Sequence, residues 1–322
     1  MKEILKLDHI QKYYGNGGNV TKAIQDISFS VQEGEFVGIM GKSMVRNLMK
    51  AGFELHIYAR TKSKVEDVIG EGAQFHESIK DCVQDCDAVI TIVGFPQDVE
   101  EVYFDEGNIL DSAKEGAYLI DMTTTSPQIA EKIYAEGTKR GFHVMDAPVT
   151  GGDTGAKAGT LSILVGGEKE DYEACMPLFE AMGTNINYQG KAGCGQHCKL
   201  ANQIMIAGTL SGVCEALTYA KEQGLDPEVF MKSVATGAAG SKQLDTFGPK
   251  ILKDDYAPGF FMKHFIKDMK LALIEANRKG LSLDVLSMVL ANYEELEQEG
   301  YGDLGTQALM KFYDEEHRNT EE

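Results

Sequence analysis

Between residues 53 and 190 the sequence alternates between short apolar runs and segments with helical spacing, and after Gly195 the strand-like runs stop. Strands that alternate with helices are typical of an α/β sheet. The run DAVITIVG (87–94) is apolar throughout, as expected for a strand that is buried on both faces of a parallel sheet. The pattern therefore predicts an α/β half followed by an all-helical half.

Turn residues and prolines at helix starts place the individual elements. We expect strands at 53–59, 87–94, 117–124, 143–150, 161–167 and 185–190, and helices at 62–69, from Pro96, at 127–140 and at 168–182. Further helices are expected at 196–223, 227–237, 243–252, 262–279, 284–298 and 303–315. The predicted domains are an N-terminal segment (1–37), an α/β domain (38–192) and a helical domain (193–322).

The charge balance excludes some classes of partner. The chain has 31 basic and 50 acidic side chains, which give a formal charge of −19. Non-specific binding to nucleic acid or to an anionic membrane needs a positive surface, so neither is expected, whereas a local positive pocket can still hold an anionic substrate. No apolar run reaches about 18 uncharged residues, and the first residues lack a signal-peptide stretch. We therefore expect a cytoplasmic protein.

The six cysteines include no CxxC pair, and without an export signal they are expected to be free thiols. Cys194, His197 and Cys198 lie close together in sequence. They lack a second ligand pair elsewhere, and a structural zinc ion needs four ligands, so we predict no metal site.

A candidate phosphate site lies in EFVGIMGKS (35–43), where a strand would enter a glycine turn and then a helix. Both the dinucleotide fingerprint GxGxxG and the P-loop GxxxxGK[ST] need glycine at position 36, but the chain has Phe36. The segment is therefore either a phosphate site built on Gly38 and Gly41 or a plain strand–turn–helix.

A second candidate, DMTTTSP (121–127), ends a predicted strand at the sheet edge where open α/β sheets bind ligands. Its threonine hydroxyls could reach a ribose or a phosphate. Alternatively, Thr125 or Ser126 simply caps the next helix.

A third candidate, DAPVTGG (146–152), also ends a strand at that edge. Thr150 would present a hydroxyl, and Gly151 and Gly152 would present backbone N–H groups, which together suit a carboxylate. A tight turn is the alternative. The following TGAKAG (154–159) is expected to be a flexible loop.

The start of the long helix carries an unusual polar group. Lys199, Asn202 and Gln203 are spaced i, i+3 and i+4, so they share one helix face. A partly buried lysine shifts its pKa readily and suits general acid–base catalysis, although a solvated polar stripe is equally compatible with the pattern. Farther on, Lys267 and Asp268 form either an exposed ion pair or an anion contact to a cofactor.

Seven segments in order, from about Gly38 to Tyr313, resemble the β-hydroxyacid dehydrogenase family, which includes 3-hydroxyisobutyrate dehydrogenase and tartronate semialdehyde reductase. The segments are GIMGKSMVRNLMKAGF, DMTTTSP, DAPVTGG, GTLSILVGG, KLANQ, PGFFMKHFIKD and GDLGTQAL. The resemblance implies a Rossmann-like dinucleotide-binding domain followed by an all-α domain. It also implies hydride transfer between a nicotinamide cofactor and a short β-hydroxy acid or its semialdehyde, in a homodimer or homotetramer.

The resemblance assigns a role to each candidate residue. Lys199 would be the catalytic acid and base, with Asn202 and Gln203 orienting the substrate or the lysine; many relatives have asparagine where this chain has Gln203. The small carboxylate substrate would bind at Thr150, Gly151 and Gly152. Imine reductases share the architecture but usually lack the lysine, so Lys199 favours carbonyl chemistry. The implied cofactor-binding residues are Gly38, Met40, Gly41, Arg60, Thr61, Val93, Gly94, Thr123, Phe260 and Lys267.

The end of the strand at 53–59 bears on the choice of cofactor. Sites selective for NAD usually carry an acidic residue there for the ribose hydroxyls, whereas an arginine accommodates the 2′-phosphate of NADP. The run from Tyr58 to Lys62 contains Arg60 and no acidic residue. We therefore predict NADP in preference to NAD.

Residues 1–41 do not fit this family and instead resemble the start of an ABC transporter ATPase. KYYG resembles its adenine-stacking loop, with Tyr13 or Tyr14 as the aromatic residue, and DISFSVQEGEFVGIMG resembles the strand before its P-loop. A full P-loop, LSGGQ and an acidic Walker B strand are missing, so ATP hydrolysis is rejected. We hypothesise a chimeric reading frame. Because Phe36 would hinder the approach of the pyrophosphate, a fusion that cannot bind the dinucleotide is the alternative function.

Overall fold

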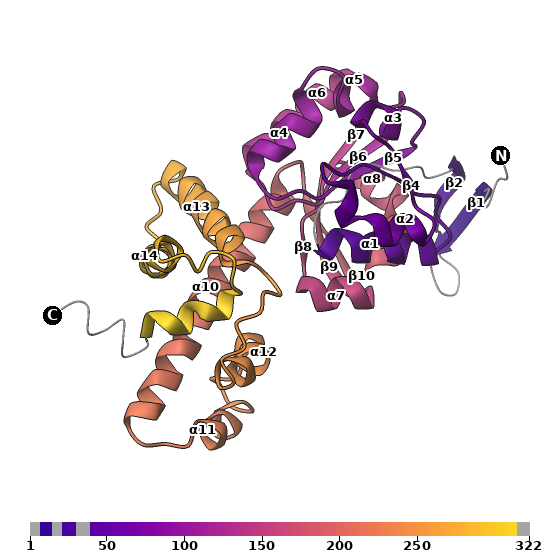
Figure 1. Ribbon diagram of the computed structural model, residues 1–322. Helices are drawn as coiled ribbons and strands as arrows, with labels where there is room; N and C mark the ends of the chain where they lie inside the picture. Colours follow the sequence, from indigo (N-terminus) through magenta and orange to yellow (C-terminus); the bar gives the residue numbers. More distant parts are fainter. Residues whose placement is uncertain (1–6, 15–20, 30–38, 314–322) are drawn as a thin grey trace. The chain divides into compact units, whose positions relative to one another are not determined.

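The structure is a computed structural model of the chain, and it describes residues 7–14, 21–29 and 39–313 (Figure 1). The chain divides into two compact units, Met1–Lys199 and Leu200–Glu322. All described strands lie in the first unit, and the second is helical. The predicted Rossmann-like α/β domain followed by an all-α domain is confirmed.

The main sheet of the first unit contains six strands in the order β10-β9-β7-β6-β5, with β8 paired to β9. Strands β5, β6 and β7 are parallel, β9 is antiparallel to β7, and β10 is parallel to β9, so the sheet is mixed. The strands are β5 (Ala88–Thr91), β6 (Tyr118–Asp121), β7 (His143–Asp146), β8 (Val149–Thr150), β9 (Leu161–Gly166) and β10 (Gly183–Gly190).

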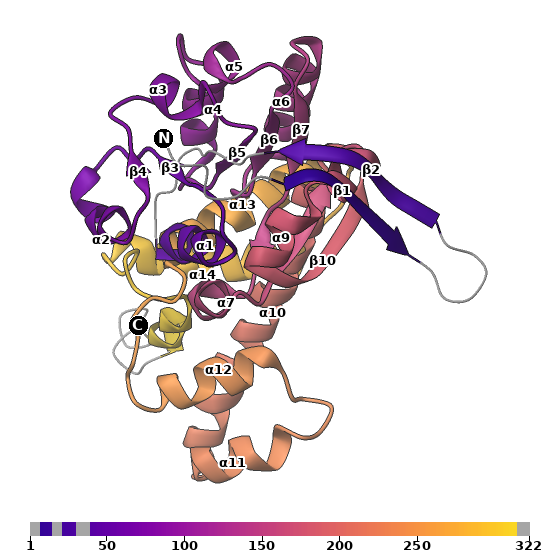
Figure 2. The ribbon, with the colours of Figure 1, turned by 90° about the vertical axis from the view of Figure 1, so that its right-hand side faces the viewer.

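Helices cover both faces of this sheet because its strands are apolar on both sides (Figures 1 and 2). Ile90 and Ile120 belong to the core under α1 and α9, whereas their neighbours Val89 and Leu119 belong to the core under α3 to α6. The helices of this unit are α1 (Ile39–Lys50), α2 (Glu66–Gly70), α3 (Ile79–Val83), α4 (Pro96–Phe104), α5 (Ile109–Ser112), α6 (Pro127–Lys139), α7 (Gly152–Ala158), α8 (Lys169–Ala174) and α9 (Met176–Met182), with the 3-10 turn η1 (Lys62–Lys64).

Two short sheets complete the described strands of this unit. Strands β3 (His56–Ile57) and β4 (Gln74–Phe75) form a parallel pair, and β1 (Leu7–Tyr14) and β2 (Thr21–Phe29) form an antiparallel pair. In the doubly wound order the first strand of the fold lies between the second and the fourth. Among the described residues, no strand bridges β3 and β5 in this way.

Several elements differ from those expected. The strand predicted at 53–59 is reduced to β3, and the helix predicted at 62–69 is divided into η1 and α2. The strand predicted at 143–150 is broken into β7 and β8, which flank Pro148, a residue with no N–H for the ladder. The helix predicted at 168–182 is two helices, because Pro177 lies in the first turn of a new one that begins at Met176.

Two further expectations were wrong. The loop predicted at 154–159 lies largely in helix α7, whose Ala156 carbonyl accepts from the Asn47 side chain at 2.7 Å. The strand and glycine turn expected at the start of EFVGIMGKS (35–43) cannot extend through Met40, since α1 begins at Ile39; residues 35–38 lie outside the described residues.

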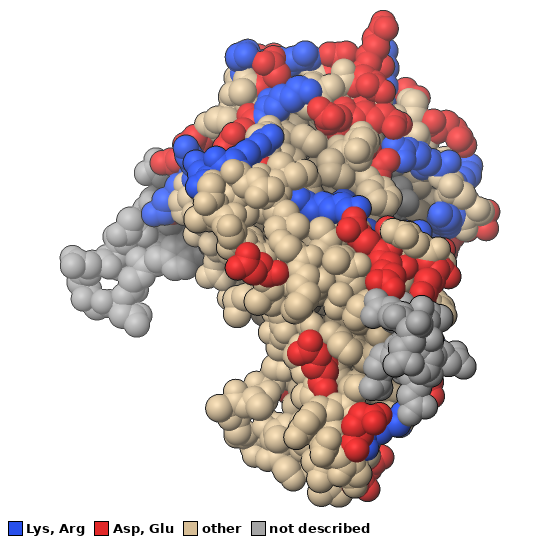
Figure 3. Space-filling model, turned by 90° about the vertical axis from the view of Figure 1, so that its left-hand side faces the viewer, with Lys and Arg blue, Asp and Glu red and all other residues tan. Residues whose placement is uncertain are grey.

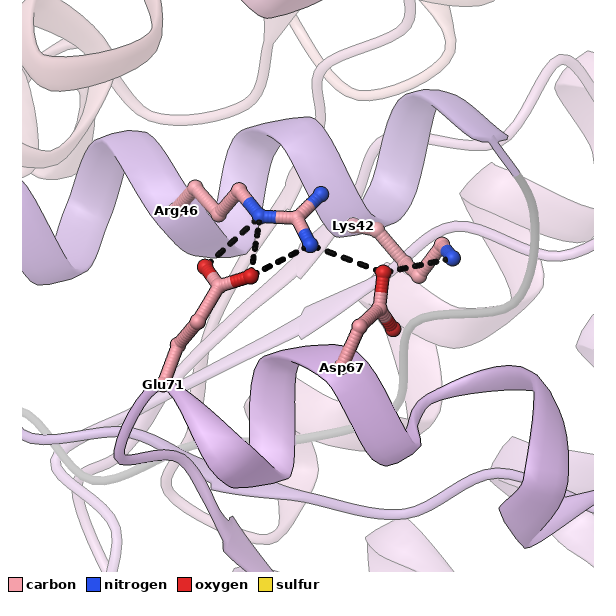
Figure 4. A network of polar contacts seen from close by, with 4 residues as sticks. All are labelled: Lys42, Arg46, Asp67 and Glu71. Atoms are coloured by element: carbon pink, nitrogen blue, oxygen red, sulfur yellow. Dashed lines mark hydrogen bonds and ion pairs between the residues drawn. The ribbon is translucent and has the colours of Figure 1, made fainter.

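An ion-pair network joins α1 to α2 (Figure 4). Arg46 contacts Asp67 at 2.7 Å and Glu71 at 2.6 Å, and Lys42 contacts Asp67 at 2.9 Å. Hydrogen bonds from Lys42 and Arg46 hold the pKa of Asp67 well below its usual range. The lysine of the incomplete P-loop pattern is therefore engaged by a carboxylate of α2.

The helical unit packs around α10 (Cys194–Glu222), whose first residues belong to the first unit. Leu200, Ala207 and Leu210 of α10 join its apolar core. The other helices are α11 (Pro227–Val234), α12 (Lys242–Ile251), α13 (Met262–Arg278), α14 (Asp284–Gln298) and the 3-10 helix η2 (Thr306–Tyr313), which replaces the α-helix expected at 303–315. By length and composition α10 could also cross a membrane, but core helices of soluble proteins meet the same criterion.

Candidate active site

The turn after β5 and the turn after β6 meet at the carboxyl edge of the parallel strands. The backbone N–H of Val93 donates to Oγ1 of Thr123 at 2.9 Å. Thr123 is 1% exposed. The structure therefore brings together three of the residues predicted to bind a cofactor: Val93, Gly94 and Thr123.

Gln196, which the sequence analysis did not identify, fixes the segment after β6 from the first turns of α10. Its Nε2 donates to the Thr123 carbonyl at 2.8 Å, and its Oε1 accepts from the Thr125 N–H at 3.0 Å. The side chain is fully buried. The partners of Gln196 are 71 and 73 residues away, so no local sequence pattern reveals these hydrogen bonds. The only sequence signal for Gln196 is its position one turn before Lys199.

Asp146 holds the start of α10 against the end of β7. Its Oδ1 accepts from the Gly193 N–H at 2.7 Å, and its Oδ2 accepts from the Gln196 N–H at 2.8 Å. A Cβ at Gly195 would lie 2.4 Å from the Leu164 carbonyl oxygen, so this approach requires glycine. The glycine-rich turn before α10 therefore serves close packing, and burial raises the pKa of Asp146 despite its two N–H donors.

Lys199 lies on α10, one turn after Gln196, and is 7% exposed. Gln203 follows one turn later and is 1% exposed, while Asn202 is half-buried. The alternative of a solvated polar stripe is therefore wrong for Lys199 and Gln203. Lysines are seldom this buried without a structural or chemical reason.

Within the helical unit, Gln203 is tied to α13. Its Nε2 donates to Oδ2 of Asp268 at 2.6 Å, and its Oε1 accepts from Nδ2 of Asn202 at 2.8 Å. Asp268 is fully buried, and its Oδ1 lies 3.1 Å from Nζ of Lys267, a side chain that is 12% exposed. The pair of Lys267 and Asp268 is therefore not the exposed ion pair of the alternative interpretation. Phe260, half-buried, packs edge-on against Phe265 with ring centroids 6.1 Å apart.

The predicted carboxylate site lies between β8 and α7. Thr150 is half-buried at the end of β8, opposite Ser162 of β9. Gly151 and Gly152 have φ angles of 132° and 63° at the start of α7, a conformation that favours glycine. A Cβ at Gly152 would meet nothing within 4 Å, so open space adjoins this turn.

Arg60, predicted to bind a 2′-phosphate, forms two ion pairs with helix α4. Its Nη1 lies 2.6 Å from Oδ1 of Asp98 and its Nη2 lies 2.7 Å from Oε2 of Glu101. The hydrogen bond to Asp98 raises the pKa of Arg60. Thr61 is exposed and precedes η1.

A buried carboxyl group lies directly behind Thr123. Oδ1 of Asp121 accepts from Oγ1 of Thr91 at 2.9 Å and from the Thr123 N–H at 3.1 Å. Oδ2 is buried without a hydrogen-bond partner. Burial raises the pKa of Asp121 to about 6 and also raises that of Tyr103, which contacts Thr91.

The residues of the glycine segment are only partly described. Gly38 and Phe36 lie outside the described residues, while Met40 and Gly41 are in the first turn of α1, where Gly41 is buried. No acidic residue occupies this turn, so no carboxylate of its own repels an anion such as a pyrophosphate there. This helix start, the Arg60 guanidinium and the Thr123 hydroxyl fit the chemistry of a dinucleotide.

None of the six cysteines, all within the described ranges, forms a disulfide. Cys194, His197 and Cys198 all lie near the start of α10. Across residues 39–313 and the two described N-terminal strands, no group of three or more histidine, cysteine, aspartate or glutamate side chains could hold a metal ion.

Two family models match the chain. The model described as the NAD binding domain of 6-phosphogluconate dehydrogenase matches residues 37–190, and the model described as NAD-binding of NADP-dependent 3-hydroxyisobutyrate dehydrogenase matches residues 193–313. The uncharacterized oxidoreductase YkwC of Bacillus subtilis is 49% identical over 86% of this chain and 96% of its own length. A probable mitochondrial 3-hydroxyisobutyrate dehydrogenase-like protein 1 of Arabidopsis thaliana is 44% identical over 85% of this chain and 82% of its own.

The chain belongs to the β-hydroxyacid dehydrogenase family. It is accordingly an NAD(P)-dependent dehydrogenase or reductase. The 2-hydroxy-3-oxopropionate reductase of Escherichia coli is 36% identical over 77% of this chain and 84% of its own. The structure of Mycobacterium tuberculosis 3-hydroxyisobutyrate dehydrogenase with L-serine matches with a TM-score of 0.80 and 26% identity, over 88% of this chain and 98% of that one.

Proposed function

We propose that this family member interconverts a short β-hydroxy acid and its semialdehyde, with Lys199 as the general acid and base. The carrying observation is that Lys199 is 7% exposed and lies one turn after Gln196, which is bonded to the segment after β6. This location suits proton transfer, because a desolvated amine close to the cofactor edge of the sheet can exchange its proton with a bound hydroxyl. The nicotinamide, when bound, accepts or supplies the hydride.

The remaining polar residues of α10 would hold the reacting group in place. In oxidation, neutral Lys199 would take the hydroxyl proton, and in reduction its ammonium form would protonate the alkoxide oxygen. Hydrogen bonds with Asp268 and Asn202 set the orientation of the Gln203 amide. Gln203 can therefore orient the substrate or the lysine without a flip of its own amide group. Lys267 and Phe260 would contact the cofactor from the helical unit.

The substrate carboxylate would bind at Thr150 and at the backbone of Gly151 and Gly152. The open space beside Gly152 and the two positive φ angles support this assignment. We propose 3-hydroxyisobutyrate as the first substrate to test, supported by the Arabidopsis relative and by the family model for residues 193–313. Tartronate semialdehyde, glyoxylate and succinate semialdehyde share the same carboxylate and carbonyl groups and complete the panel.

The cofactor would bind at the carboxyl edge of the sheet, with NADP preferred over NAD. Arg60 and Thr61 would receive the ribose 2′-phosphate, and Gly38, Met40 and Gly41 would receive the pyrophosphate. The turns containing Val93, Gly94 and Thr123 would contact the nicotinamide half.

The deciding experiment is a fluorescence titration of purified protein with NADPH and with NADH, followed by the substrate panel. The expected result is saturable binding, together with reduction of NADP⁺ or NAD⁺ by 3-hydroxyisobutyrate or oxidation of NADPH or NADH by one of the carbonyl substrates. Nucleotide binding with no turnover of any of the four panel substrates would overturn the proposed substrate class. No binding of either nucleotide by folded protein would overturn the enzymatic function.

An impaired chimeric fusion is the second candidate. Its support is that the family match begins at residue 37, which leaves the segment resembling an ABC ATPase outside, and that Phe36 stands where the fingerprint has glycine. In that case Phe36→Gly should tighten nucleotide binding. Long-read sequencing of the source DNA across codons 30–50 distinguishes a natural junction from an assembly error.

We further propose a cytoplasmic homodimer or homotetramer that binds neither nucleic acid nor membrane. Most large exposed apolar side chains belong to the helical unit, as expected for a subunit interface. They are Met205, Tyr219, Leu225, Val229, Ile274, Leu281, Val285 and Met288. On the face drawn in Figure 3, basic side chains lie among acidic ones, an arrangement that does not favour binding to nucleic acid or to an anionic membrane. Light scattering after size-exclusion chromatography tests the assembly; a monomer at micromolar concentration would contradict it.

A further inference from the structure

We propose that Asp98 and Glu101 restrain the preference for NADP by competing with the ribose 2′-phosphate for Arg60. The inference rests on the proposed function, because it assumes that the dinucleotide ribose binds beside Arg60. The consequence is a smaller preference for NADPH over NADH than Arg60 alone would give. The acidic side chains that the strand end lacks are supplied by α4.

The Arg60 guanidinium is already engaged by carboxylates of α4. Arg60 lies three residues after the end of β3, on the carboxyl side of the strand after which α/β folds bind ribose. Both of its terminal nitrogens are engaged, one by Asp98 at 2.6 Å and the other by Glu101 at 2.7 Å. Arginine binds phosphate through the same paired N–H groups, so carboxylate and phosphate compete for one set of donors.

The two carboxylates that contact Arg60 are held differently. Oδ2 of Asp98 accepts from the Phe95 N–H at 2.9 Å, which fixes the side chain in the first turn of α4. Its side chain is 20% exposed, whereas that of Glu101 is 51% exposed and accepts no backbone N–H within the described part of the chain. Glu101 can therefore swing away to admit a phosphate, while Asp98 stays close to it.

The acidic side chains around Arg60 also disfavour a phosphate on the ribose. A phosphate monoester carries close to two negative charges at neutral pH, so it would be repelled by Asp98 and by a displaced Glu101. NAD has no phosphate there, and its ribose hydroxyls can donate to a carboxylate. The acids therefore lower the affinity for NADP and not that for NAD. Asp98 and Glu101 lie 38 and 41 residues from Arg60 in the sequence, so the residues at the strand end alone could not predict their effect.

The test compares Glu101→Gln with Glu100→Gln by fluorescence titration with NADPH and with NADH. Both changes remove one negative charge from α4, but Glu100 pairs with Lys132 at 3.0 Å and not with Arg60. We expect Glu101→Gln to lower the dissociation constant for NADPH by about three- to tenfold, with that for NADH changed less than about twofold. Glu100→Gln should change neither dissociation constant.

A second variant, Arg60→Gln, should remove most of the remaining affinity for NADPH while preserving that for NADH. If both nucleotides bind the unmodified chain and Glu101→Gln leaves their ratio unchanged, this inference is overturned while the proposed function stands. If neither nucleotide binds the folded chain, the proposed function and this inference fail together.

Discussion

Gln203 donates its side-chain amide to Asp268 at 2.6 Å, and this bond joins α10 to α13 through two side chains that are at most 1% exposed. Asp268 also lies 3.1 Å from the ammonium group of Lys267. The bond fixes which way the Gln203 amide points, because Nε2 must face the carboxylate and Oε1 is left for Asn202. The polar group of the helical unit is thus held in one orientation.

Removing the carboxylate should therefore destabilise the helical unit. Asp268→Ala removes the acceptor of the buried Gln203 amide and the carboxylate that pairs with the Lys267 ammonium, so we expect a loss of about 2–4 kcal/mol in the free energy of unfolding. Asp303→Ala is the control, since Asp303 forms an ion pair with Lys263 but its side chain is 79% exposed. That change should cost no more than about 1 kcal/mol. Urea unfolding monitored by circular dichroism measures both, and equal losses would contradict the role of Asp268.

Lys199→Ala should reduce the rate of turnover by about 10²–10⁴-fold, the usual contribution of a general acid or base, while nucleotide binding is retained. Lys221→Ala is a matched control, because Lys221 is an exposed residue of the last turn of the same helix. Its turnover should stay within about twofold of the unmodified chain. Initial rates, followed by the absorbance of the reduced nucleotide, test both variants. Near-normal turnover in Lys199→Ala would exclude the proposed proton transfer.

Gln196→Glu should make stability depend on pH. The introduced carboxylate would face the Thr123 carbonyl, where Nε2 now donates, and burial would raise its pKa. Protonated, it can donate in place of the amide, so the deficit should be small near pH 5. The deficit should grow to about 2–4 kcal/mol as pH rises through the raised pKa towards 8.

The exposed Gln223→Glu provides the comparison, with no such pH dependence expected. Thermal unfolding of both variants at several pH values is the measurement. A pH-independent deficit in Gln196→Glu would show that the donated bond to Thr123 contributes little.

The order of the main-sheet strands and of the longer helices could be predicted because it is carried by local apolar runs, but the strand lengths and the short elements β4, α3 and α5 could not. The predicted strands at 87–94 and 117–124 stop at Thr91 and Asp121, since the chain leaves the sheet there to form the turns at Val93 and Thr123. Helix α7 was missed because glycine-rich TGAKAG has low helix propensity. Its Ala156 is fully buried and bonded to Asn47, a contact 109 residues away.

The candidate site was predictable only where its residues lie in short motifs. Lys199, Asn202 and Gln203 share one helix face by spacing alone, and the threonine and glycine turns follow predicted strands. Gln196, Asp146 and the acids around Arg60 act through partners at least 38 residues away, which no local pattern encodes. Arg60 shows the consequence most clearly, because its surroundings are acidic although its sequence neighbours are not.

Asp121 should make the fold more stable in mild acid. Burial raises its pKa to about 6, against about 3.9 in an unfolded chain, so the folded state binds the proton more tightly. This contribution is fully present below about pH 4 and is lost as pH rises through 6, where the buried carboxylate costs about 3 kcal/mol. In Asp121→Asn the amide oxygen can accept from Thr91 and the Thr123 N–H as Oδ1 does, without the charge. We therefore expect a higher melting temperature than that of the unmodified chain at pH 8 and a smaller difference at pH 5.

Asp146→Asn should destabilise the fold at pH 8, although burial raises the pKa of Asp146 as well. Both oxygens of Asp146 accept backbone N–H groups, from Gly193 and Gln196, so an amide must turn its own NH₂ towards one of these donors. A lost hydrogen bond and two opposed donors should cost about 1–3 kcal/mol at pH 8. Thermal unfolding of both variants between pH 4.5 and 8 separates the two cases. Asp121 has one oxygen without a hydrogen-bond partner, whereas both oxygens of Asp146 accept hydrogen bonds. Destabilisation of both variants by the same amount at pH 8 would show that the charge on Asp121 is not the cost that its burial implies.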